Sequence, residues 1–150
     1  MGRAGVGNPR ALANLLVAGP TRGARAVAAF VARVAGGGVF VAFGVGKFTR
    51  HASEVASFEE YGLPAADAFV YAIGVVELVG GLLLVLGLLT RPAALVLAGD
   101  MVAAIILSGI ALGEIISLTL APAELLICLY LLWTGPGVLA LDHRLRGPAP

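Results

Sequence analysis

The sequence predicts an all-α membrane protein: a four-helix transmembrane bundle with both termini in the cytoplasm. Of the 150 residues, 59% are hydrophobic and only 13% are charged. Soluble domains carry about 25% charged residues, and the mean hydropathy of this chain is +0.98. Four apolar stretches reach the length of about 20 residues that a helix needs to cross a bilayer. Composition and length therefore favour an integral membrane protein surrounded by lipid.

The four predicted spans cover residues 26–48, 66–89, 93–112 and 122–141. Proline is tolerated in the first turn of a helix. We therefore expect the third span to start beside Pro92 and the fourth span to start at Pro122. In the connection 50–64, glutamates alternate with apolar residues, which predicts a short amphipathic helix at the membrane surface. The predicted domains are a basic cytoplasmic tail at 1–25, a four-span membrane domain at 26–141 and a second cytoplasmic tail at 142–150.

The distribution of basic residues predicts the orientation. The two tails and the turn after the second span share the arginines Arg3, Arg10, Arg22, Arg25, Arg91, Arg144 and Arg146. The opposite side has only Lys47 and Arg50 close to a span. Because basic residues are retained in the cytoplasm, we expect both termini to be cytoplasmic and the glutamate-rich connection 50–64 to lie outside. We expect a multi-pass protein of the bacterial inner or plasma membrane. No basic cluster resembles a nucleic-acid surface, so no nucleic-acid partner is predicted, and a homo-oligomer stays open.

The second span carries one acid, Glu77, in an otherwise apolar helix. Helical spacing places Gly80 and Gly81 on the same side as Glu77. The opposite side is branched and apolar, with Val75, Val79, Leu82 and Leu86. Small residues allow close approach of another membrane helix. We therefore expect the glycine face to contact a neighbouring span and the branched face to contact lipid.

Charges within the spans fall into two layers. Arg33, Glu77 and Asp100 lie near the bilayer centre and are predicted to form one polar cluster, since an unpaired charge there is costly. Two acids for one base predict that one carboxyl group stays protonated, which makes Glu77 and Asp100 candidates for proton or quinone chemistry. The alternative is that these charges only fix the register of the helices.

In the layer nearer the outer surface, Lys47 is predicted to pair with Glu124 in preference to Glu114. His51 follows on the same face as Lys47, and a lone histidine beside acids favours an interfacial residue over a metal ligand. No metal site is predicted. Cys128 is the only cysteine, so an internal disulfide is excluded and a packed thiol is expected.

Several motifs together resemble the DoxX family. They are Arg33, FGVGKF at 43–48, Phe58, YGLP at 61–64, ELVGG at 77–81 and LGLLTR at 86–91. Members of that family are small four-helix membrane proteins. Some are linked with quinone-dependent sulfur oxidation, or with membrane oxidoreductase complexes that handle thiol or oxidative stress.

The resemblance implies a membrane subunit with quinone as its cofactor and other membrane or peripheral redox subunits as partners. In that interpretation Glu77 and Asp100 exchange a proton with a quinone headgroup, and Arg33 balances the charge. The chain itself shows no haem ligand pair, no iron–sulfur cysteines and no dinucleotide loop. Two alternatives stay open: a non-enzymatic scaffold or small-molecule binding module with structural ion pairs, and a small transporter.

Overall fold

The computed structural model describes residues 23–145, and every regular element in that range is helical. The elements are α2 (Ala24–Thr49), α3 (His51–Glu60), α4 (Ala66–Leu86), α5 (Thr90–Ala104), the π-helical segment η1 (Ile105–Ile110), α6 (Ile115–Thr134) and α7 (Asp142–Leu145). The predicted all-α class is thus confirmed. The predicted basic tail at 1–25 lies almost wholly outside the described residues.

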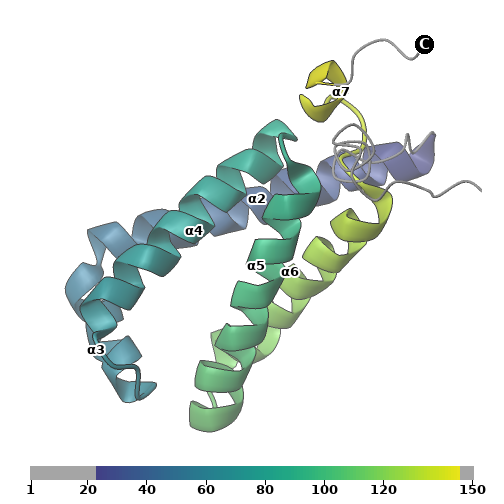
Figure 1. Ribbon diagram of the computed structural model, residues 1–150. Helices are drawn as coiled ribbons and strands as arrows, with labels where there is room; N and C mark the ends of the chain where they lie inside the picture. Colours follow the sequence, from purple (N-terminus) through teal and green to yellow (C-terminus); the bar gives the residue numbers. More distant parts are fainter. Residues whose placement is uncertain (1–22, 146–150) are drawn as a thin grey trace, which may run out of the picture.

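Four helices are long and apolar enough to cross a membrane: α2, α4, α5 continued by η1, and α6. Helix α2 packs mainly against α4, and α5 packs mainly against α6. Figure 1 shows these two pairs meeting at the end that carries α7 and separating toward the end that carries α3. We refer to these as the α7 end and the α3 end. The short helix α3 lies where residues 50–64 were predicted to form an amphipathic helix.

Glycines on α4 allow the close packing that the sequence predicts. A Cβ atom at Gly81 would lie 2.7 Å from the carbonyl oxygen of Gly37 on α2, and one at Gly80 would lie 3.0 Å from the Leu97 side chain on α5. The predicted contact of both glycines with neighbouring spans is confirmed. On the opposite face of α4, Val75 and Val79 are each 50% exposed. This face is therefore free to contact lipid.

The predicted start of the fourth span is wrong. Helix α6 begins at Ile115, so Pro122 lies inside the helix instead of opening it. A proline removes one helical hydrogen bond, and membrane helices tolerate that loss when neighbouring groups compensate. The helix ends at Thr134 and is followed by Gly135, whose φ of 80° is unfavourable for other residues. The positive φ of Gly113 ends the preceding segment, so the link between the spans is much shorter than expected.

The chain after α6 folds back over the α7 end. The Asp142 carboxylate accepts hydrogen bonds from the backbone N–H groups of Leu89, at 2.7 Å, and Thr90, at 3.0 Å. The Val138 N–H donates to the carbonyl oxygen of Ala26 at 3.1 Å. The start of α2 and the segment leading to α7 are therefore on the same side of the bundle, as a four-span topology requires.

Candidate functional site

A cavity of about 430 Å³ lies between the two helix pairs, beneath α3. Every helix from α2 to α6, with η1, contributes to its lining. The charged residues that line it are Lys47, Arg50, Glu54, Glu77, Asp100, Glu114 and Glu124, and the aromatic ones are Phe40, Phe43, Phe58, Tyr61 and Phe69. Four of the residues singled out in the sequence, on four different spans, thus surround one cavity: Lys47, Glu77, Asp100 and Glu124.

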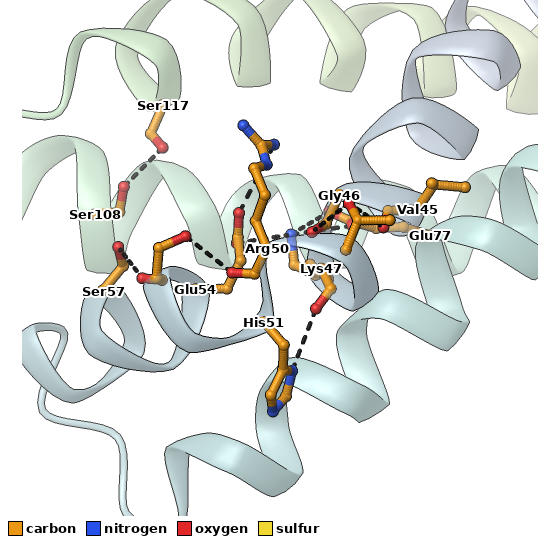
Figure 2. Close-up of polar contacts among 12 residues, drawn as sticks. Val45, Gly46, Lys47, Arg50, His51, Glu54, Ser57, Glu77, Ser108 and Ser117 are labelled. Carbon is orange, nitrogen blue, oxygen red and sulfur yellow. Dashed lines mark hydrogen bonds and ion pairs between the residues drawn. The ribbon is translucent and has the colours of Figure 1, made fainter.

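Lys47 forms an ion pair with Glu77 across the α2–α4 interface. Its Nζ atom lies 3.1 Å from Glu77 Oε1 and 3.0 Å from Oε2 (Figure 2). Both side chains are buried, and Glu54 on α3 lies 3.9 Å from the same ammonium. A Cβ atom at Gly74 would lie 3.1 Å from the Lys47 Cβ atom, so the glycine leaves room for the base of the lysine side chain.

The predicted pairing of Lys47 with Glu124 or Glu114 is therefore wrong. The physical reason is the length of the lysine side chain. The prediction pairs charges by the depth of their Cα atoms in the membrane, but a lysine carries its charge several ångströms from its own Cα atom. Here that reach brings the ammonium to an acid assigned to the deeper layer.

Arg33 does not contact Glu77 or Asp100. The predicted cluster therefore names the wrong basic residue. The guanidinium of Arg33 donates to the carbonyl oxygens of Val85, Val138 and Leu139, at 3.3, 3.2 and 3.4 Å. Val85 lies about 12 Å along α4 from Glu77 at the rise of a helix. Arg33 is fully buried at the α7 end, where it fastens the returning chain to α2 and α4. Lys47 is the base that faces Glu77.

Asp100 and Glu124 reach the cavity from α5 and α6. The Oδ2 atom of Asp100 and the Oε2 atom of Glu124 are buried without a hydrogen-bond partner among the described residues. A Cβ atom at Gly36 would lie 2.9 Å from Glu124 Oε2, so this glycine leaves the space that the carboxylate occupies. The Cys128 thiol is near enough to both carboxylates to interact with their charge. The two acids thus belong to one region of the cavity wall.

Three hydroxyl groups surround the Glu114 carboxylate at the α3 end. Tyr61 donates to Oε2 at 3.3 Å and Ser117 at 2.8 Å, and Ser108 donates to the same oxygen. Figure 2 shows the further bond between Ser108 and Ser117, at 2.7 Å. The hydrogen bond from Ser108 is the main reason that the pKa of Glu114 is lowered, and burial is the main reason that the pKa of Tyr61 is raised.

Sequence reasoning missed this hydroxyl cluster. Ser108 lies in η1, and π-helical turns change the direction in which side chains point. Nothing in the local sequence indicates such a turn. Gly113, by contrast, directly follows an apolar run and is an ordinary signal for a helix end. That signal would have placed the fourth span correctly and brought Ser117 close to Ser108.

His51 lies beside the cavity and joins α3 to α4. Its Nε2 atom is 2.8 Å from Asp67 Oδ1, and its Nδ1 atom is 3.2 Å from the carbonyl oxygen of Lys47. The ring stacks on Tyr71 with centroids 4.2 Å apart. The hydrogen bond to Asp67 raises the pKa of His51. Because both ring nitrogens face acceptors, the doubly protonated imidazolium satisfies both contacts.

The cavity opens laterally as well as toward α3. Its exposed lining includes Phe69 on α4, and Ala103 and Leu107 on the facing α5 and η1. All three are apolar, so the exposed part of the cavity lining between α4 and the α5–η1 helix is apolar.

Comparison with known proteins assigns the family. The sequence profile of the DoxX family matches residues 28–110. The chain belongs to the DoxX family. The matched region contains Arg33, Lys47, Glu77 and Asp100 and ends before α6, so Glu124 lies outside it. The predicted resemblance is confirmed.

A relative shares the membrane character of this DoxX protein. The uncharacterized membrane protein Rv3486 of Mycobacterium tuberculosis is 46% identical to it over 101 residues, which cover 59% of this chain and 62% of the relative. The match therefore spans about three fifths of that relative's length. No solved structure matches the chain. The DoxX protein described here is an integral membrane protein with four candidate spans.

Proposed function

We propose that this DoxX protein is a quinone-binding subunit of a membrane oxidoreductase complex in a bacterial cell membrane, in the chemistry of sulfur compounds, thiols or oxidative stress. The observation that carries the proposal is the cavity that reaches the Lys47–Glu77 ion pair and opens laterally between α4 and α5. A quinone carries its polar headgroup on an apolar tail, so a polar cavity with an apolar side opening suits its two parts.

The lining residues fit a quinone headgroup. The Lys47 ammonium donates a hydrogen bond to a carbonyl oxygen, and rings such as Phe40 and Phe43 offer apolar surfaces for the headgroup. The unpartnered Oδ2 atom of Asp100 gives a second polar contact. A bound quinone supplies two-electron, two-proton redox chemistry. The electrons would come from a partner subunit, and Glu77 and Asp100 would give up or take the protons at their carboxyl oxygens.

Purification in a mild detergent, followed by mass spectrometry of bound lipids and quinones, tests the proposal directly. We expect a quinone to copurify, and we expect Glu77→Gln to abolish quinone-linked activity while the protein stays folded. Glu60→Gln is the matched control, because Glu60 is exposed on α3 and does not line the cavity. If neither endogenous nor added quinone binds the folded protein, the proposal fails.

The second candidate is a non-enzymatic scaffold or small-molecule binding module. The observation that favours it is the Lys47–Glu77 pair, because it joins α2 to α4 and would be needed for packing in the absence of any chemistry. In this case Glu77→Gln would lower the thermal stability of the protein, and no quinone-dependent reaction would be found with any partner subunit. The proposal also includes redox subunits as partners of this protein and its assembly into a homo-oligomer.

A further inference from the structure

We infer that Asp100 and Glu124 form a binding site for a lipophilic amine, which the cavity holds as an ammonium ion between two carboxyl groups and several aromatic rings. This inference goes beyond the proposed quinone chemistry and does not rest on it. It follows from which charges of the cavity are paired, from the aromatic lining and from the lateral opening.

The charges of the cavity are unevenly paired. Lys47 lies between Glu77 and Glu54, and the Arg50 guanidinium is 4.0 Å from Glu54. The Glu114 carboxylate is held by three hydroxyl groups. The two cations are thus engaged at the α2 and α3 side of the cavity. Asp100 on α5 lies within range of the Lys47 charge but forms no ion pair with it, and Glu124 on α6 has no cation among the described residues.

Glu124 is the clearest indication of a missing ligand. Its side chain lines the cavity and is only 4% exposed, yet Oε2 has no hydrogen-bond partner among the described residues. Asp100, on α5, is partly buried and also lines the cavity, and its Oδ2 atom is likewise buried without a hydrogen-bond partner among the described residues. Buried polar groups are nearly always hydrogen-bonded, and a buried carboxylate without a partner is costly. A cation placed between these two groups would satisfy both.

The rest of the lining favours an organic cation over a metal ion. Five aromatic rings face the cavity, and aromatic faces attract ammonium groups. The Phe58 ring already does so, with its centroid 5.9 Å from the Lys47 ammonium. In the part of the chain that the structure describes, no group of three or more His, Cys, Asp or Glu side chains is arranged to hold a metal ion. The cavity volume of about 430 Å³ is also that of a small organic ligand.

The lateral opening gives such a ligand a path. A tertiary amine crosses the bilayer as the uncharged base and reaches the cavity between Phe69 and Leu107. There it takes the proton of the Asp100 or Glu124 carboxyl group, which leaves an ammonium–carboxylate pair. The N–H bond that forms replaces the O–H bond that breaks, so no further reactant is needed.

The test compares a phenylalkyl dimethylamine with the hydrocarbon of the same shape, in which a CH group replaces the nitrogen. Both are titrated into the full-length protein in a non-ionic detergent by isothermal calorimetry. We expect the amine to bind at least about tenfold more tightly than the hydrocarbon. We expect Glu124→Gln and Asp100→Asn each to remove most of this preference and to leave hydrocarbon binding unchanged. Glu60→Gln is the control variant and should keep the full preference.

Equal affinity for the amine and the hydrocarbon would overturn the inference, and so would a full amine preference in both variants. Circular dichroism melting of each variant reports whether it is folded. If one variant does not fold, the other carries the comparison, and the amine-to-hydrocarbon ratio of the unmodified protein is decisive by itself. Because the amine and the quinone are titrated separately, failure of either proposal is distinguishable from failure of the other.

Discussion

The ammonium of Lys47 lies 3.0 Å from Glu77 Oε2, between the first two spans of the chain. Helices α2 and α4 approach closely because glycines line their contact, and this approach brings the two charges together in a buried position. The pair is at the same time a fastening between α2 and α4 and the polar wall of the cavity. A single interaction thus connects the packing of the bundle with its candidate chemistry.

Removing one member of this pair should be more harmful than removing both. Lys47→Met leaves Glu77 buried without its partner, and breaking a buried pair costs about 3–5 kcal/mol. The double variant Lys47→Met with Glu77→Leu leaves no unpaired charge and should recover part of the loss. Denaturant unfolding in detergent micelles gives the coupling energy, which we expect to exceed about 0.5 kcal/mol. Strictly additive losses would show that the pair contributes nothing to stability.

The glycine face of α4 should be intolerant of side chains, and its lipid face should be tolerant. Gly81→Leu forces a side chain against the Gly37 carbonyl oxygen and the Phe40 Cβ atom, which are 2.7 and 2.9 Å from the position of a Cβ atom. Val79→Leu adds volume at a half-exposed position and should change stability by less than about 0.5 kcal/mol. Melting temperatures of the two variants in one detergent make the comparison. Equal losses would mean that the helix faces are assigned wrongly.

The comparison of these two positions also explains why much of the fold could be predicted. Bilayer thickness fixes the length of a span, and helical periodicity separates Gly81 from Val79, so both properties are written in the local sequence. The start of the fourth span is predicted wrongly because Pro122 normally opens a helix. Here the apolar residues before Pro122 continue the span, and they outweigh the local effect of the proline.

The partners of the charged residues could not be predicted in the same way. Arg33 was assigned to the acids nearest its own depth, but its side chain bonds to carbonyl oxygens of a segment more than a hundred residues later. Lys47 reaches Glu77 because its stem is long and because Gly74 lets the two helices approach. Such contacts depend on how helices rotate against one another, and no single span of sequence contains that information. Glu77, Asp100, Lys47 and Glu124 were nonetheless identified as the buried charges, because a charge within an apolar span is rare.

Asp142 should be important for stability although it is far from the cavity. Its carboxylate accepts the hydrogen bonds of the Leu89 and Thr90 N–H groups, which start α5 and would otherwise be unsatisfied. Loss of a capping side chain costs about 1–2 kcal/mol, so Asp142→Ala should lower the melting temperature clearly. Glu60→Ala is the control, because Glu60 is an exposed acid at the end of α3 and caps no helix by hydrogen bonding. Equal melting of both variants would contradict a capping role for Asp142.

The sidedness of the bundle can be tested by labelling. Basic residues predict that the α7 end is cytoplasmic and that α3 is outside. Cysteines introduced at Ser57, on α3, and at Ala149, beyond the described residues, should therefore react with an impermeant maleimide from opposite faces of intact cells. The native Cys128 is fully buried and should remain unlabelled. Labelling of both introduced cysteines from outside would overturn the predicted orientation.

His51 should make the attachment of α3 dependent on pH. The hydrogen bond to Asp67 raises the pKa of His51 above its ordinary value of 6.5. The folded state therefore holds the proton more tightly than the unfolded state does. This contribution to stability is fully present below about pH 6.5 and is lost as the pH rises through the raised pKa of the folded protein. The melting temperature should accordingly fall between about pH 6 and pH 9 by an amount that depends on His51.

His51→Gln and Asp67→Asn should each remove this part of the pH dependence, because each removes one member of the imidazolium–carboxylate contact. Neither change should alter the Lys47–Glu77 pair, which lies on the cavity side of α2. Limited proteolysis within α3 gives an independent readout, since a loosened α3 is cut faster. In the unmodified protein, cleavage should accelerate as the pH rises over the same interval, and in His51→Gln it should be fast throughout. A pH profile of melting and cleavage that is identical in all three proteins would show that α3 is held to α4 by contacts other than the His51–Asp67 pair.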